Sequence, residues 1–154
     1  MNLTVDASVF VAASRSEEVH YPASHQFLQQ IRAHRCNLFC PTLLLPECAA
    51  AIARPTANAR LAEELVSLIE TFPRLQLIPL DLPLAHRAVQ VAREHRLRGA
   101  DSVYVSVAET FSARLIAWDA EMLERGAQVV ATMTPLEWIE EQPAAESEES
   151  TGLP

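Results

Sequence analysis

The sequence contains no lysine: each of its 12 basic residues is arginine. A P-loop needs a lysine against the phosphates of its nucleotide, and a Schiff-base enzyme needs the lysine amine. Receiver domains likewise place a lysine beside their acidic pocket. The three glycines form no G-x-G-x-x-G pattern, so the dinucleotide-binding fingerprint is missing too. The first three classes lack an essential side chain here, and the fourth lacks its loop.

Cysteines and long apolar runs are also scarce. Cys36, Cys40 and Cys48 are an odd number without a C-x-x-C pair, so no disulfide framework is expected. His34 near Cys36 and Cys40 leaves a zinc site open, but buried thiols in a reducing compartment are the favoured interpretation. No apolar stretch could span a bilayer, and the first residues lack the features of a signal peptide. We therefore expect a cytoplasmic protein with no membrane partner.

The net charge of −8 argues at first against a nucleic-acid partner. From Glu137 onward, however, there are six glutamates and no arginine, so the preceding part of the chain is close to neutral. Residues 141–154 lack any apolar period, which predicts a disordered acidic tail after one domain over residues 1–140. Arginine clusters, rather than net charge, would have to bind a polyanion.

The apolar pattern alternates between strand and helix. Strands are predicted at residues 2–6, 37–40, 75–80, 115–118 and 128–131. Helices are predicted at residues 8–13, 22–34, 42–54, 57–70, 83–95, 100–112 and 120–125. This alternation predicts an α/β fold whose parallel sheet is covered by helices on both faces.

Four acidic residues stand alone where apolar runs break: Asp6, Glu47, Asp101 and Asp119. A carboxylate beside apolar surface is costly unless it is neutralised. Sites in parallel α/β sheets form outside the carboxyl ends of the strands, where Asp6 and Asp119 are expected to lie. We therefore predict one site around a hard cation, which could polarise a phosphoryl oxygen and activate water.

Each acid alone also has an ordinary structural explanation. Asp6 and Asp119 could cap helices, and Asp101 could face a helix dipole. Glu47 is harder to explain this way, because it lies among leucine, cysteine and alanine. Coincidence of all four is the weaker explanation.

Four segments resemble the motifs of the PIN-domain nucleases, most closely those of VapC-type toxin ribonucleases. They are Val5-Asp6-Ala7-Ser8-Val9, Pro46-Glu47-Cys48-Ala49-Ala50-Ala51, Gly99-Ala100-Asp101-Ser102-Val103-Tyr104 and Trp118-Asp119-Ala120-Glu121-Met122-Leu123. Order and spacing agree over residues 1 to about 140.

The resemblance implies a three-layer α/β/α sandwich with a parallel sheet in the order 3-2-1-4-5. It also implies Mg²⁺- or Mn²⁺-dependent cleavage of single-stranded RNA, with Asp6 and Asp101 as principal metal ligands. Glu47 and Asp119 would complete the site or orient water, and Ser8 would support it. One departure is Ala117, where many members carry a hydroxyl residue, which puts the role of Asp119 in doubt.

Three arginines precede Asp101: Arg93, Arg96 and Arg98. They could bind RNA phosphates at the rim of the site, or they could be a solvated helix end that the dipole favours. Trp118 could stack a base, but a buried aromatic is favoured.

We predict an endoribonuclease, the toxin half of a type II toxin–antitoxin pair. The implied partner is a small antitoxin, whose helix could bury Leu61, Leu65 and Leu68 and whose arginine could pair with the acids. That apolar face could instead be core or a homodimer surface. The alternatives are a housekeeping RNA-processing nuclease of the same fold and a non-catalytic RNA- or protein-binding module.

Overall fold

A five-stranded parallel sheet forms the centre of the molecule. The structure, a computed structural model, describes residues 1–142. The strands are β1 (Asn2–Val5), β2 (Asn37–Pro41), β3 (Leu75–Ile78), β4 (Arg114–Ile116) and β5 (Thr132–Met133). They pair in the order β3-β2-β1-β4-β5, and every pair is parallel. The predicted α/β class and strand order are confirmed.

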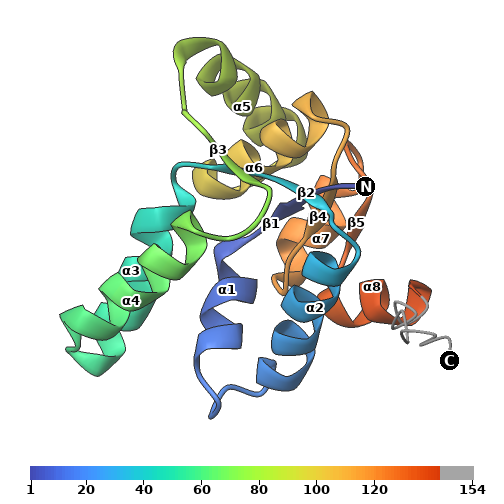
Figure 1. Cartoon of the computed structure of the whole chain (residues 1–154). Coiled ribbons are helices and arrows are strands. Elements are labelled where there is room, and N and C mark those ends of the chain that lie inside the picture. The colour runs from blue at the N-terminus through green and yellow to red at the C-terminus, as the bar shows by residue number, and fades with distance from the viewer. Residues whose placement is uncertain (143–154) are drawn as a thin grey trace, which may run out of the picture.

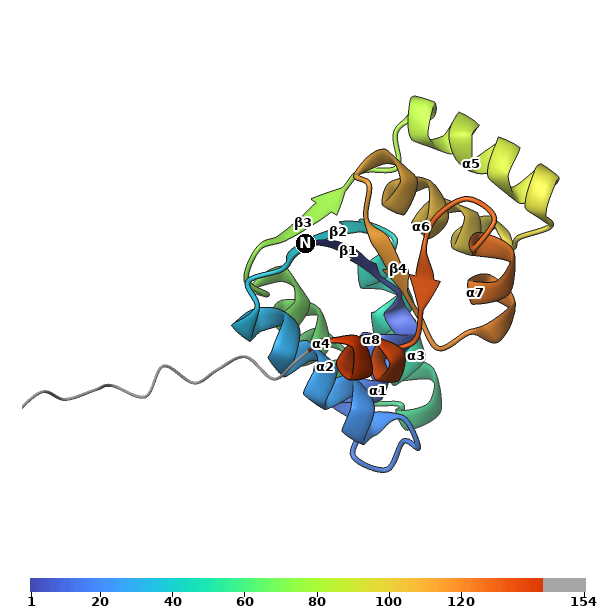
Figure 2. The same ribbon diagram turned by 90° about the vertical axis from the view of Figure 1, so that its right-hand side faces the viewer.

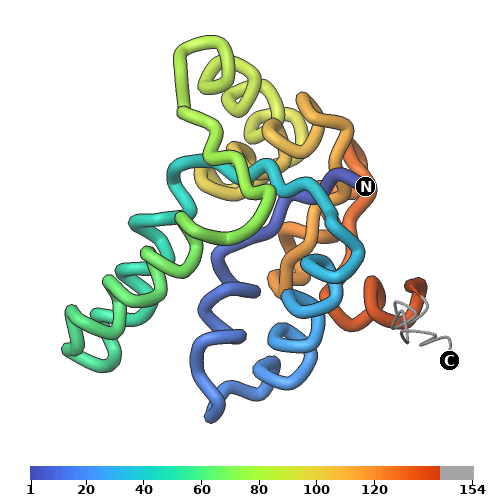
Figure 3. Tube along the Cα trace, viewed as in Figure 1, coloured from blue at the N-terminus to red at the C-terminus, as the bar shows by residue number. Residues whose placement is uncertain are grey.

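Helices cover both faces of this sheet (Figure 1, Figure 2). The helices are α1 (Ala7–Ser14), α2 (Tyr21–Ala33), α3 (Leu44–Thr56), α4 (Ala59–Glu70), α5 (Leu82–His95), α6 (Gly99–Thr110), α7 (Ala120–Gly126) and α8 (Pro135–Glu141). Helices α5, α6 and α7 lie on one face, and α1, α2 and α8 on the other. The hairpin of α3 and α4 packs against α1 and extends away from the sheet (Figure 3).

Strand β1 lies at the centre of the sheet and ends directly at the predicted site. Leu3 pairs with β2 on one side and β4 on the other, and both Leu3 and Val5 are fully buried. Such a strand reads as an unbroken apolar run, because helices cover both of its faces. The carboxyl ends of β1 and β4 are therefore neighbours, which brings the segments that follow Val5 and Ile116 together.

The predicted strand at residues 128–131 is wrong. The backbone N–H groups of Val129 and Val130 donate to the carbonyl of Gly126, so this stretch turns back on the end of α7. Strand β5 follows it at Thr132–Met133. Two adjacent valines favour a strand, but their N–H groups are already used by the helix end.

Helix α8 was not predicted, although the sequence carries a start signal for it. Thr134 and Glu137 form a capping box, and Pro135 occupies the first helical position. Trp138 fixes the helix to the core, because it is fully buried and meets the Phe27 ring edge to face at 5.2 Å. The helix ends at Glu141, and the predicted acidic tail otherwise lies outside the described residues.

Two further features bear on the sequence analysis. Cys36, Cys40 and Cys48 are buried free thiols, and burial raises the pKa of Cys40 to about 12. Helix α3 continues through Pro55, one residue before its end, whereas the sequence analysis placed a break there. Among residues 1–142, no helix combines the length and the apolar character that a membrane crossing requires.

Candidate metal-dependent active site

Asp6 lies at the carboxyl end of the central strand and begins the first helix. Its backbone N–H donates to the carbonyl of Ile116 at the end of β4, 2.9 Å away. Its Oδ2 accepts the backbone N–H of Ser8 at 3.0 Å, so Asp6 caps α1. Burial raises the pKa of Asp6, although the hydrogen bonds from Ser8 and Ala7 act in the opposite direction. Asp6 therefore does cap α1, but the hydrogen bonds of the cap do not fully offset the cost of burying its charged carboxylate.

Glu47 lies in the first turn of α3 and is held by a tyrosine. The hydroxyl of Tyr104 donates to Glu47 Oε2 at 2.6 Å. Burial raises the pKa of Glu47, and the charges of Asp6 and Asp101 raise it further. Tyr104 itself is completely buried, and burial raises its pKa strongly, so it stays a neutral donor.

Tyr104 is a site residue that the sequence analysis did not single out. It was treated as one of several apolar residues that follow Asp101. The available signal was its spacing: a residue three positions after Asp101 on one helix lies on the same face. Tyr104 orients Glu47 across the gap between α6 and α3, a role that needs its hydroxyl.

Asp101 and Asp119 come from two further helix starts. Asp101 lies in the first turn of α6, and Asp119 caps α7 by accepting the backbone N–H of Met122 at 2.8 Å. Burial raises the pKa of Asp101. The hydrogen bond from Met122 lowers the pKa of Asp119, and Arg98 lowers it further.

Arg98 bridges these two acids. Its Nε donates to Asp101 Oδ2 at 3.0 Å, and its Nη2 donates to Asp119 Oδ2 at 2.5 Å. The arginine side chain is nonetheless 61% exposed, so it reaches into the acids from outside. Arg98 thus supplies the positive charge that a metal ion would supply at the same oxygens.

The four acids form one cluster at the carboxyl edge of the sheet, and we call the region between them the acidic crevice. The charge of Asp119 raises the pKa of Asp6, and the charge of Asp6 raises those of Glu47 and Asp101. Such mutual repulsion requires that the carboxylates lie near one another. Within residues 1–142, no three His, Cys, Asp or Glu side chains are grouped closely enough to hold a metal ion as they stand.

The parallel sheet in the order β3-β2-β1-β4-β5 and the four acids beside it can be compared with known protein families. The sequence matches the PIN domain over residues 3–128. The chain belongs to the PIN-domain family.

Several solved structures share this fold at low sequence identity. One is VapBC2 from Rickettsia felis bound to a promoter DNA fragment, with 12% identity, a TM-score of 0.66 and coverage of 87% of this chain and 98% of that one. Another is Mycobacterium tuberculosis VapC20, described as a sarcin–ricin loop cleaving toxin, with 14% identity, a TM-score of 0.67 and coverage of 78% and 92%. FitAcB from Neisseria gonorrhoeae has 18% identity, a TM-score of 0.66 and coverage of 88% and 98%. No curated protein matches the sequence significantly.

Ser8 and Trp118 form a hydrogen bond next to Asp6 and Asp119 in this PIN domain. Ser8 Oγ accepts the backbone N–H of Trp118 at 3.2 Å, which ties α1 to the segment after β4. The Trp118 ring stacks on His20 with centroids 3.9 Å apart, and its Nε1 donates to Ser24 Oγ at 2.8 Å. Trp118 is therefore a packing residue in this structure, because its ring and its Nε1 both have partners within the protein.

The three arginines before Asp101 differ in their contacts. Arg98 is engaged by Asp101 and Asp119, as described above. Arg93 is 74% exposed and lies 3.7 Å from Glu94, and Arg96 adopts a left-handed conformation at the end of α5. The carbonyl of Arg96 accepts a hydrogen bond from Arg125. The phosphate role of Arg93, Arg96 and Arg98 stays a prediction, and in this structure the guanidinium of Arg98 faces the carboxylates of Asp101 and Asp119.

Ala117 is the departure from the family pattern noted in the sequence. It is fully buried and offers no hydroxyl beside Asp119. The carboxylate of the nearby Glu121 pairs with Arg125 of the same helix at 2.8 Å. In this PIN domain the side chain that donates a hydrogen bond to Asp119 is that of Arg98, beside the backbone N–H of Met122.

Proposed function

We propose that this PIN domain is a divalent-metal-dependent endoribonuclease that cleaves single-stranded RNA, and that it acts in the cytoplasm as the toxin of a type II toxin–antitoxin pair. The observation that carries the nuclease proposal is the crevice of four carboxylates from four separate segments. Ionised carboxylates are rarely gathered like this without a cation to neutralise them. The raised pKa values of Asp6, Glu47 and Asp101 record this cost.

The donor set fits Mg²⁺ or Mn²⁺, which favour carboxylate and water oxygens over nitrogen or sulfur. Asp6 and Asp101 are the proposed principal ligands, with Glu47 and Asp119 completing the site. A bound divalent ion would polarise a phosphoryl oxygen and lower the pKa of a water molecule. Full use of the Asp101 and Asp119 oxygens requires Arg98 to leave them.

The protein's own groups prepare this chemistry. Asp6, Asp101 and Asp119 each stand at a helix start, where the dipole favours negative charge. Tyr104 holds Glu47 in one orientation with its hydroxyl. The hydrogen bond between Ser8 and the backbone of Trp118 fixes the start of α1 beside Asp6 before substrate arrives.

The toxin proposal rests on family likeness and on a groove that a partner helix could occupy. The similar structures include VapBC2 and FitAcB, and a further one is described as FitAB bound to a DNA fragment. In this chain, a groove of about 220 Å³ lies between α1, α2 and α4. Its walls include Leu65, which is buried, and Leu68, which is 54% exposed.

An antitoxin helix placed there would bury Leu68, as helices do in apolar grooves, and would have to extend along α4 to reach Leu61. An antitoxin arginine could also pair with Asp6, Glu47 or Asp101, in the way that Arg98 already pairs with Asp101. A homodimer remains a prediction for the same apolar surface.

Two experiments test these proposals separately. Purified protein should cleave single-stranded RNA with Mg²⁺ or Mn²⁺ and lose this activity with EDTA; absence of cleavage in both metals contradicts the nuclease. Expression of the wild-type chain should arrest growth, whereas Asp6→Asn should not. Co-expression with a neighbouring small gene should relieve the arrest and yield a complex that Leu68→Asp weakens. Persistent arrest without a complex would refute the toxin–antitoxin pairing and leave the nuclease proposal standing.

A further inference from the structure

A second groove leaves the acidic crevice between α1 and α3. It has a volume of about 770 Å³ and is much larger than the groove beside α4. Ala7 and Val11 of α1 form one wall, and Ala50 and Ala51 of α3 form the other. Figure 1 shows the two helices diverging from the sheet edge, with α1 running beside the α3–α4 hairpin.

The groove is continuous with the proposed active site. Ser8 and Glu47 line it, and both belong to the first turns of their helices, next to the sheet edge. Arg54 and Pro55 line it as well, near the end of α3. Arg54 follows Glu47 by seven residues, so the two lie on one helix face about 10 Å apart along the axis. The groove thus runs from a carboxylate at the crevice to a cation two turns away.

Small side chains keep this groove open. Ala50 and Ala51 follow Glu47 by three and four positions, which places them on the same face of α3. Both are exposed, although the rest of that helix buries Leu44, Cys48 and Ile52 in the core. Leucine in either place would fit a helix equally well and would fill the groove.

Arg54 differs from most other arginines of residues 1–142. Arg15, Arg60, Arg87, Arg98, Arg114 and Arg125 all pair with a carboxylate at 3.1 Å or less. Arg54 is exposed and takes part in no ion pair among the described residues. Its charge is therefore free for a ligand in the groove.

From these observations we infer that the α1–α3 groove binds the single-stranded RNA next to the cleaved bond, with Arg54 on a backbone phosphate. This inference rests on the proposed nuclease function and extends it to a substrate-binding residue. The neutral alanine walls would pack a ribose or base, and the guanidinium would bind the phosphate through charge-assisted hydrogen bonds. The phosphate-binding arginines predicted from the sequence precede Asp101, whereas Arg54, which lines the groove, belongs to α3.

Binding of a fluorescent single-stranded RNA oligonucleotide tests the inference in an Asp6→Asn background with Mg²⁺, where cleavage is blocked. Arg54→Ala should weaken binding about 10-fold or more, as expected for the loss of one hydrogen bond to a charged group. The slope of log K against log salt should fall by about 0.7, the value for one phosphate contact on a single strand. Arg54→Lys should recover part of the affinity.

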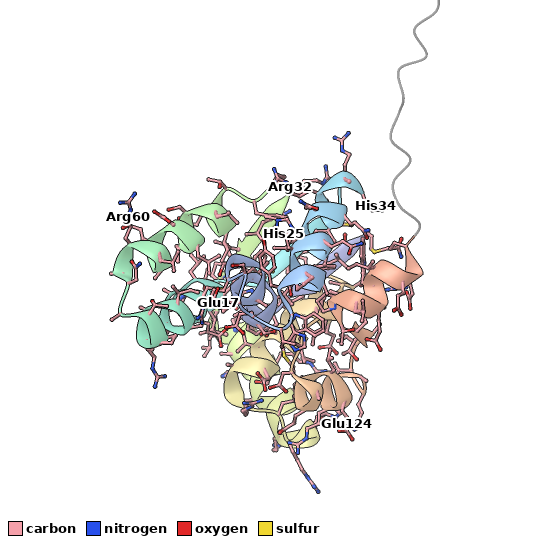
Figure 4. All side chains as sticks on the ribbon, turned by 90° about the horizontal axis from the view of Figure 1, so that it is seen from below. Glu17, His25, Arg32, His34, Arg60 and Glu124 are labelled. Carbon is pink, nitrogen blue, oxygen red and sulfur yellow. The ribbon has the colours of Figure 1, made fainter. Side chains whose placement is uncertain are left out.

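Arg60→Ala is the matched control. Arg60 is 88% exposed, pairs only with Glu64 of its own helix, and points away from the molecule in Figure 4. Its loss removes the same charge but should leave RNA affinity within about 2-fold, because exposed charges at a distance are screened. Ala51→Leu, with Arg54 intact, should weaken RNA binding by filling the groove while leaving the melting temperature unchanged.

In the cleaving protein, Arg54→Ala should raise KM more than it lowers kcat. Equal RNA affinity and salt slope for Arg54→Ala and Arg60→Ala would overturn the inference. So would an Arg54→Ala variant that loses only its protein partner, since this would assign the groove to that partner. These results are distinguishable from failure of the proposed function, in which the wild-type chain neither binds nor cleaves RNA.

Discussion

Two arginines of this protein contact carboxylates in different surroundings: Arg98 in the acidic crevice and Arg87 on the outer face. In the crevice, Arg98 contacts Asp101 and Asp119, yet burial still keeps the pKa of Asp101 above its usual range. On the outer face, Arg87 of α5 holds Glu109 of α6 through two hydrogen bonds of 2.6 and 2.7 Å. That contact lowers the pKa of Glu109.

The difference lies in the ratio of charges and in solvent access. One arginine balances one half-exposed glutamate on the outer face. In the crevice, one arginine faces a cluster of four acids that are partly removed from water. The outer pair is a closed structural contact, whereas the crevice keeps an excess of negative charge. A surplus that costs stability is the expected property of a site that binds a cation.

The largest expected effect is the loss of RNA cleavage when one acid of the crevice is neutralised. Asp6→Asn or Asp101→Asn should lower RNA cleavage by more than the roughly 10- to 100-fold typical of residues behind the metal ligands. Asp81→Asn is the matched control, because Asp81 also caps a helix after a strand but lies outside the crevice. Rates measured on one RNA substrate decide the matter. Full activity in either crevice variant would contradict the assigned site.

The second effect concerns the competition between Arg98 and a metal ion. Removing the arginine in Arg98→Ala frees oxygens of Asp101 and Asp119, so Mn²⁺ should bind several-fold more tightly by calorimetry. The metal-free variant should also melt at a lower temperature, because the acids lose their one counter-charge. Arg87→Ala should leave Mn²⁺ affinity unchanged. Equal Mn²⁺ affinity in Arg98→Ala and the wild type would show that the arginine does not compete.

Addition of metal should sharpen the same contrast in the wild-type protein. A ligand that binds only the folded state raises stability by about 2.7 kcal/mol at 100 times its Kd. Millimolar Mg²⁺ or Mn²⁺ should therefore raise the melting temperature, and Asp101→Asn should reduce this rise. A melting curve that ignores both ions would count against a metal site.

The pH dependence should run in opposite directions for the two regions. The pKa values of Asp6, Glu47 and Asp101 are raised by burial above the ordinary 3.8 and 4.5. Between those ordinary values and the raised ones, the folded state binds more protons than the unfolded state. The metal-free protein should therefore gain stability from these three acids as pH falls through this window, whereas Asp119, whose pKa is lowered, contributes in the opposite direction. Asp6→Asn should show a smaller gain in denaturant melts.

The Glu109 pair should contribute the smallest effect. Its pKa is lowered, so its stabilisation is present above the ordinary value of 4.5 and is lost as pH falls through the lowered pKa. Arg87→Ala should cost only about 0.5 kcal/mol near neutral pH, because both side chains are more than a third exposed. A loss of several kcal/mol in urea unfolding would mean that the contact between α5 and α6 depends on this pair.

Much of the architecture was accessible from apolar periodicity. The buried run before Asp6 and the helical spacing of residues 22–34 indicate their elements directly, because each buries a face with the period of its backbone. The strand at residues 128–131 failed for a local reason: the N–H groups of Val129 and Val130 donate to the carbonyl of Gly126 at the end of α7. Helix α8 was missed although Thr134 and Glu137 carry the local signal that begins it.

The amino-acid sequence by itself determined which carboxylates stand beside apolar segments and in which order they occur. Those features are local, since each acid ends or begins an element whose pattern is visible within a few residues. Only the tertiary structure decided which groups neutralise or orient the acids. Arg98 reaches Asp119 and Tyr104 reaches Glu47 across 21 and 57 residues of sequence. It also decided that Arg54 lines the groove while Arg98 faces the acids, because side-chain direction depends on how helices pack around the sheet edge.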